Sequence, residues 1–123
     1  MAQARIIPRD HWRDGADASL WKGRIEGVDV GTDTTVLFYA TDKIGTGPRW
    51  HVHDYDEIFI LTEGRALFTV GDQKIEAQAG DVVIGPAHVP HKYHNLGPGR
   101  LTSIDIHCSA RWVQTDLDDP EFA

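Results

Sequence analysis

The pattern of apolar and polar positions becomes typical of β-strands at residue 34. From Thr34 to Arg100, short β-branched and aromatic runs alternate with clusters of Gly, Pro, Asp and Asn, and residues 34–40 read TTVLFYA. No stretch in this region shows the sustained 3.6-residue period of an amphipathic helix. The pattern predicts strands over residues 34–40, 48–53, 57–62, 65–70, 74–77, 82–84, 91–94 and 101–107, and therefore an all-β sandwich or barrel.

Two of these strands are apolar at consecutive positions, residues 58–61 (IFIL) and residues 82–84 (VVI). A strand of this kind needs cover on both of its faces. One face would line the interior of the barrel, and the other would pack against a second layer or another subunit. We therefore expect a homodimer.

The chain divides into three parts around this β-rich region. Residues 1–33 contain Trp12 and Trp21 but no helical period, so we expect an N-terminal arm that packs on the barrel or on a dimer partner. Residues 34–110 form the predicted barrel. Residues 111–123 form a C-terminal tail, whose acidic stretch 116–121 is expected to be solvated.

Length and charge narrow the classes of function. A chain of 123 residues suits one domain, and its 12 Lys and Arg are scattered under a formal net charge of −7, which argues against a nucleic-acid partner. No apolar run is long enough to cross a membrane, and the N-terminus lacks the pattern of a signal peptide. The single cysteine, Cys108, excludes an intramolecular disulfide. We expect a cytoplasmic protein without a membrane partner.

A candidate metal site lies near the middle of the sequence. His51 and His53 are two residues apart and project to the same face of a strand, and Glu57 shares their parity if the strand is continuous or its break is compensated. Two imidazoles and a carboxylate are typical ligands of a first-row transition metal. The site needs a fourth ligand. His91, which opens a short strand after a turn bounded by prolines, is a candidate.

These residues lie within two longer motifs. Residues 45–64 read GTGPRWHVHDYDEIFILTEG and residues 80–95 read GDVVIGPAHVPHKYHN, with fifteen residues between Gly64 and Gly80. The two stretches resemble the two motifs of the cupin superfamily at nine of ten fixed positions. The exception is His88, which stands where the family usually has glycine, and this suggests a backbone with positive φ at that position.

The resemblance implies a small single-domain cupin with a double-stranded β-helix, or jelly-roll, barrel that often forms dimers. It also implies one divalent metal held by His51, His53, Glu57 and His91. Imidazole and carboxylate ligands suit Fe, Mn, Ni, Co or Zn. Four protein ligands would leave two positions of a six-coordinate ion for water, substrate or dioxygen.

Four other residues are candidates for contact with a substrate. Arg49 shares the parity of His51 and could hold a carboxylate, or it could be an ordinary surface arginine. Phe59 is expected on the apolar floor, and His88 near the mouth of the cavity. Tyr93 could donate a hydrogen bond, act as an acid or base, or simply pack in the barrel. No metal role is expected for the remaining histidines, which are His11, His94 and His107.

Three classes of function follow from these expectations. The leading one is a metal-dependent enzyme acting on a small polar metabolite, either a dioxygenase or an isomerase, lyase or cyclase that uses the metal as a Lewis acid. The second is a non-catalytic, metal-containing cupin that binds a small molecule or sugar. The third is an interaction module that uses the apolar outer face of its sheet. The cupin fold hosts many chemistries, so the resemblance does not choose among them.

Overall fold

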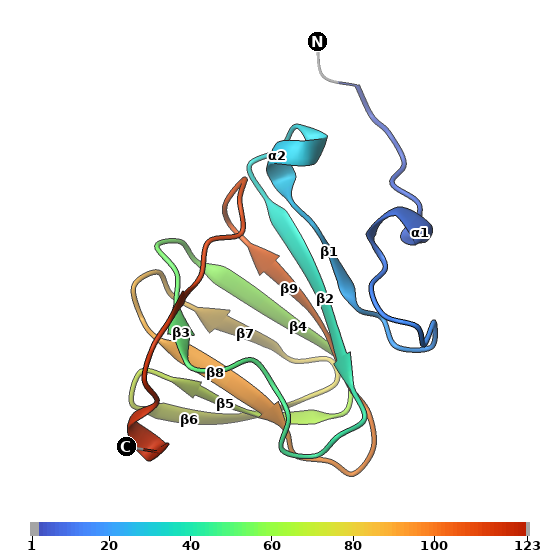
Figure 1. The fold of residues 1–123 in the computed structure, drawn as a ribbon. Helices are drawn as coiled ribbons and strands as arrows, with labels where there is room; N and C mark the ends of the chain where they lie inside the picture. Colours follow the sequence, from blue (N-terminus) through green and yellow to red (C-terminus); the bar gives the residue numbers. More distant parts are fainter. Residues whose placement is uncertain (1–2, 123) are drawn as a thin grey trace.

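The computed structural model describes residues 3–122 and consists mainly of short strands (Figure 1). The helical elements are brief: α1 (Arg9–Trp12), α2 (Gly27–Val30) and a 3-10 turn (Pro120–Phe122). None of the helices in these residues is long and apolar enough to cross a membrane. The strands are β1 (Gly23–Ile25), β2 (Thr35–Thr41), β3 (His51–Val52), β4 (Glu57–Glu63), β5 (Arg65–Val70), β6 (Gln73–Gln78), β7 (Val82–Gly85), β8 (His91–Asn95), β9 (Leu101–His107) and β10 (Thr115–Asp116).

The strands form two five-stranded antiparallel sheets. The strand order is β1-β2-β9-β4-β7 in one sheet and β10-β3-β8-β5-β6 in the other. The chain crosses repeatedly from one sheet to the other, and the sheets pack face to face (Figure 1). This arrangement confirms the predicted jelly-roll barrel.

The core lies between the two sheets and follows from the alternation of side chains along each strand. Phe59 on β4 lies 5.0 Å from Phe68 on β5 between ring centroids, and Tyr93 on β8 stacks on Phe68. All three rings are almost fully buried. Their outward neighbours on β7, Val82 and Ile84, remain 57% and 53% exposed. The sheet of β4 and β7 therefore presents apolar side chains on both of its faces.

Most predicted strands agree with the observed ones within two residues, but β3 is shorter than the predicted strand over 48–53. It contains only His51 and Val52. Pro48 has no N–H to contribute to a ladder, and residues 54–55 form a bend. This bend carries the chain from the sheet of β3 to the sheet of β4. The two predicted halves of the metal site therefore reach one another across the barrel.

Both ends of the chain pack on the barrel in the described residues. In the arm, β1 pairs with β2, and the ring of Trp12 stacks on Phe38 with centroids 3.9 Å apart. At the other end, β10 pairs with β3. Residues 111–122 are largely exposed, as expected of a solvated segment. Ion pairs of Lys92 with Asp119 and of Lys74 with Glu121 nevertheless hold the end of this segment against the barrel.

Candidate metal centre

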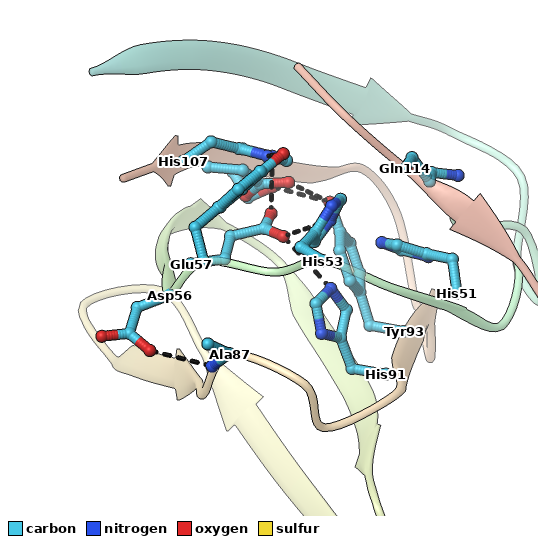
Figure 2. Close-up of polar contacts among 12 residues, drawn as sticks. His51, His53, Asp56, Glu57, Ala87, His91, Tyr93, His107 and Gln114 are labelled. Carbon is cyan, nitrogen blue, oxygen red and sulfur yellow. Dashed lines mark hydrogen bonds and ion pairs between the residues drawn. The ribbon is translucent and has the colours of Figure 1, made fainter. Parts of the chain in front are cut away.

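Four buried side chains meet at one end of the barrel interior, namely those of His51, His53, Glu57 and His91. One potential ligand atom from each lies within 4.8 Å of the other three. His51 and His91 are direct partners in the β3–β8 ladder, whereas Glu57 begins β4 in the opposite sheet. Figure 2 shows the Glu57 carboxylate directed toward the imidazoles. The fold therefore brings together all four predicted ligands.

The spacing and hydrogen bonding of these atoms fit a single transition-metal ion. The Nε2 atoms of His53 and His91 each lie 3.1 Å from Oε1 of Glu57. Ligands at right angles around an ion, each about 2.1 Å from it, are separated by about 3.0 Å. The Nδ1 atoms of His51 and His53 contact the carbonyl oxygens of Arg49 and Val113, which leaves both Nε2 atoms free to bind a metal.

The protonation states of the cluster also suit a metal. Burial lowers the pKa of His51 to about 4, so its ring is neutral near pH 7. Burial opposes the ionisation of Glu57, but contacts with His107, His53 and His91 hold the pKa of that carboxyl well below its usual value. His51 thus offers a neutral imidazole and Glu57 an ionised carboxylate, the forms in which these side chains bind metals.

His107 lies beside the cluster, where no metal-related role was expected for it. Its side chain is 2% exposed, and its Nε2 lies 3.0 Å from Oε2 of Glu57. Its Nδ1 is 2.8 Å from the hydroxyl of Tyr55, which also lies 3.0 Å from the carbonyl oxygen of Val113. Glu57 therefore faces two histidines with one carboxylate oxygen and His107 with the other.

A cavity of about 420 Å³ adjoins the cluster and gives exogenous molecules a place to bind. His51, Glu57 and His107 form part of its wall. Asp105 and Tyr93 line it as well, and the Tyr93 hydroxyl donates a hydrogen bond of 2.6 Å to Oδ2 of Asp105. Burial raises the pKa of Tyr93 well above its ordinary value, so this hydroxyl keeps its proton.

The comparison with family models decides the family. The model described as "Cupin domain" matches residues 38–107, which include all four clustered residues. The chain belongs to the cupin family.

The cupin matches several known proteins over part of its length. An uncharacterised protein of Streptomyces coelicolor is 39% identical over 62 residues, 50% of this chain and 58% of the relative. An acireductone dioxygenase of Geobacillus kaustophilus is 28% identical over 80 residues, 59% of this chain and 44% of the relative. The chain thus spans about half the length of the curated relatives it matches.

Solved structures share the cupin's fold at low sequence identity. A conserved double-stranded β-helix protein of Klebsiella pneumoniae has a TM-score of 0.71 at 17% identity, covering 95% of this chain and 100% of that one. An oxalate decarboxylase of Bacillus subtilis has a TM-score of 0.70 at 19% identity, covering 77% of this chain and 27% of that one.

The predicted substrate-contact residues Phe59, Arg49 and His88 differ in burial and in their distance from the cavity interior. Phe59 lies in the cavity wall and is 1% exposed. Arg49 also lines the cavity, but its side chain is 77% exposed and its guanidinium lies 3.8 Å from the Asp116 carboxylate. His88 has a φ of 67°, as its glycine-like position suggested, and its backbone N–H donates to the carbonyl of His53. Contact of these residues with a substrate stays a prediction.

Asp105 and His107 are the residues that the sequence reasoning missed. Both lie on β9, whose alternating burial places them on the inner face. Alternation along residues 101–107 did not indicate this, because Ile104 and Ile106 have the opposite parity and would place Asp105 and His107 on the outer face. Their place beside the metal cluster depends on the pairing of β9 with β4, which puts His107 opposite Glu57 and Asp105 opposite Phe59.

Proposed function

We propose that this cupin is a metal-dependent enzyme that acts on a small metabolite. The observation that carries the proposal is the opening of the buried His and Glu cluster onto the 420 Å³ cavity, whose wall includes His51 and Glu57. A metal site that only stabilised the barrel would need no such access. The cluster sits where a metal and a bound molecule would meet.

A metal at this site would supply Lewis-acid polarisation of a substrate oxygen or, if it is iron, the activation of dioxygen. His51, His53, Glu57 and His91 would hold it. The chain's own residues then divide the remaining tasks. His107 fixes the orientation of the Glu57 carboxylate, Phe59 forms the apolar floor, and Tyr93 keeps Asp105 in place through its hydrogen bond.

The proposal includes two reaction types, a dioxygenase reaction and a Lewis-acid reaction without oxygen. The match to a protein named acireductone dioxygenase supports including oxygen chemistry. A Lewis-acid isomerase, lyase or cyclase is compatible with the same ligands. Arg49, at the exposed end of the cavity, would attract the charged part of an anionic substrate.

The test is a screen for turnover with matched protein samples. Oxygen consumption and product formation are measured with small hydroxy acids, uronates, diketones and catechols, using the metal-containing protein and the His51→Ala, His53→Ala variant. The proposal predicts turnover of at least one class by the first sample only. Tight binding of a compound with no turnover would instead support a non-catalytic binding protein.

The quaternary structure is also part of the proposal. Val82 and Ile84 project from β7 on the outer face of the sheet, where they are more than half exposed. Burying such an apolar face against a second copy of the chain would stabilise a homodimer. The cavity lies on the inner side of the same sheet, so each subunit would keep its own site.

A further inference from the structure

Asp105 is a buried carboxyl group outside the four-residue metal cluster. It lies on β9, is 3% exposed and lines the cavity beside the cluster. Its Oδ2 accepts the 2.6 Å hydrogen bond from Tyr93. Its Oδ1 is buried and has no hydrogen-bond partner among residues 3–122. A buried polar atom without a partner costs stability, so its presence in a cavity wall points to a ligand.

The surroundings of Asp105 favour its neutral form. No Lys, Arg or His forms an ion pair with it in the described part of the chain. Burial raises the pKa of Asp105 to about 8, and the negative charge of Glu57 acts in the same direction. Since Oδ2 already accepts the hydrogen bond from Tyr93, the proton of the neutral acid belongs on Oδ1. Asp105 therefore presents an O–H donor rather than a negative charge.

The rest of the cavity wall defines the kind of molecule that would use this donor. Its lining beside the cluster is largely apolar or aromatic and includes Leu37, Phe38 and Phe59. Trp112 also lines the cavity, and its Nε1 is a second buried donor without a partner in residues 3–122. Two unused donors in an apolar wall suit a compact apolar molecule that carries oxygen acceptors.

We propose that the Oδ1–H group of Asp105 binds a carbonyl or carboxyl oxygen of a small ligand whose apolar part lies against Phe59 and the β2 side chains. This inference rests on the proposed function in one respect, because it places the ligand in the same cavity as the substrate of the proposed enzyme. It names the chemical class of that substrate, a carbonyl or carboxyl compound with an apolar body. The Tyr93 hydroxyl, which donates to Oδ2 of Asp105, also lies 3.2 Å from the Ser103 hydroxyl oxygen. These two hydroxyl groups position the Asp105 carboxyl group.

The experiment compares two probes that differ mainly in one oxygen, acetophenone and ethylbenzene. Dissociation constants for the full-length protein are measured by ligand-observed NMR. The proposal predicts that the wild type binds acetophenone about tenfold more tightly than ethylbenzene, the effect of one buried hydrogen bond. Asp105→Leu removes the donor and should abolish the preference. Asp105→Asn keeps a donor, and Ile104→Val lies on the opposite face of β9 outside the cavity wall, so both should retain it.

Equal affinities for the two probes in the wild type, or an undiminished preference in Asp105→Leu, would overturn the assignment. A second measurement does not depend on the folding of Asp105→Leu. The carboxyl-carbon resonance of Asp105, identified by its absence in Asp105→Asn, should shift on addition of acetophenone and stay fixed with ethylbenzene. An unchanged resonance at saturating acetophenone would contradict the proposal.

Metal analysis of the same preparations separates this inference from the proposed function. A protein that lacks metal but prefers acetophenone would support the role of Asp105 and contradict the metal-dependent enzyme. A metal-containing protein with no preference between the probes would contradict the role of Asp105 and leave the enzyme proposal standing.

Discussion

The Glu57 carboxylate is shared between the metal cluster and a histidine outside it. Its Oε1 is 3.1 Å from the Nε2 atoms of His53 and His91, and its Oε2 is 3.0 Å from that of His107. Figure 2 shows His107 on the side of the carboxylate opposite His91. Because the second oxygen is occupied, Glu57 would offer one oxygen to a metal.

The first prediction concerns this contact. His107→Ala should weaken metal binding by about 10- to 100-fold, the usual effect of removing a group that orients a ligand. His107→Gln, which can return an amide N–H to Glu57, should restore part of the loss. Metal affinity is measured by competition with a chelator of known affinity, and His94→Ala, on the opposite face of β8, is the control. Equal affinities for all four proteins would show that His107 does not orient Glu57.

The second prediction concerns the pH dependence of stability. The pKa of Asp105 is raised from 3.8 to about 8 in the folded state, so the stability contributed by its proton is complete below pH 3.8 and is lost as the pH rises toward 8. Asp105→Asn has no such proton. With EDTA present, the free energy of unfolding of the wild type should fall relative to that of Asp105→Asn between pH 5 and 8, by at most about 1.4 kcal/mol per pH unit.

Chemical denaturation at several pH values, with Ile104→Val as a matched variant, measures this difference. Ile104→Val should follow the pH dependence of the wild type, because it retains the Asp105 carboxyl group and lies on the opposite face of β9. A constant difference between the wild type and Asp105→Asn would mean that Asp105 ionises in the folded protein much as it does in the unfolded chain.

At the scale of the elements, the C-terminal segment completes the metal centre. In β10, Asp116 pairs with His51 of β3, and upstream of it the carbonyl of Val113 contacts both Nδ1 of His53 and the hydroxyl of Tyr55. Figure 1 shows this red segment running across the β3 side of the barrel. The segment thus holds one ligand strand and sets the orientation of one ligand ring.

A pair of truncations gives the third prediction. Ending the chain at Arg111 removes the Val113 carbonyl and β10, and it should lower metal affinity by at least about tenfold through loss of ring orientation. Ending it at Asp118 removes the ion pairs of Asp119 and Glu121 but keeps β10, and it should leave the affinity within about twofold. The chelator competition described above applies. Equal losses of metal affinity in both truncations would mean that the ion pairs of Asp119 and Glu121, and not β10 or the Val113 carbonyl, cause the loss.

Local spacing in the sequence predicted the strands and grouped His51, His53 and Glu57, and the resemblance to the second cupin motif added His91. Alternation within a strand is a property of neighbouring residues, and the two motifs carry His51, His53, Glu57 and His91 at fixed separations. The roles of Asp105 and His107 depend on the β4–β9 register, which joins residues about fifty positions apart. No local pattern records that register, so these two contacts became visible only in the folded chain.

At the scale of the whole molecule, the outer face of β4 and β7 remains apolar and accessible. The fourth prediction is that this face forms the homodimer contact. Val82→Glu with Ile84→Glu should convert a dimer into a monomer, because two charges would have to be buried in the contact. Ile44→Glu, at a residue 60% exposed in the loop between β2 and β3, is the control. Light scattering at micromolar concentration checks the masses, and a monomeric wild type would contradict the prediction.

The central claim is that His51, His53, Glu57 and His91 hold one transition-metal ion. Elemental analysis of protein isolated without added metal tests it most directly, with wild type, the His51→Ala, His53→Ala variant and a His11→Ala, His94→Ala control prepared in parallel. The account predicts about one equivalent of metal in the wild type and control, and almost none in the site variant. Metal content that is unchanged in the site variant, or absent from all three proteins, would contradict it.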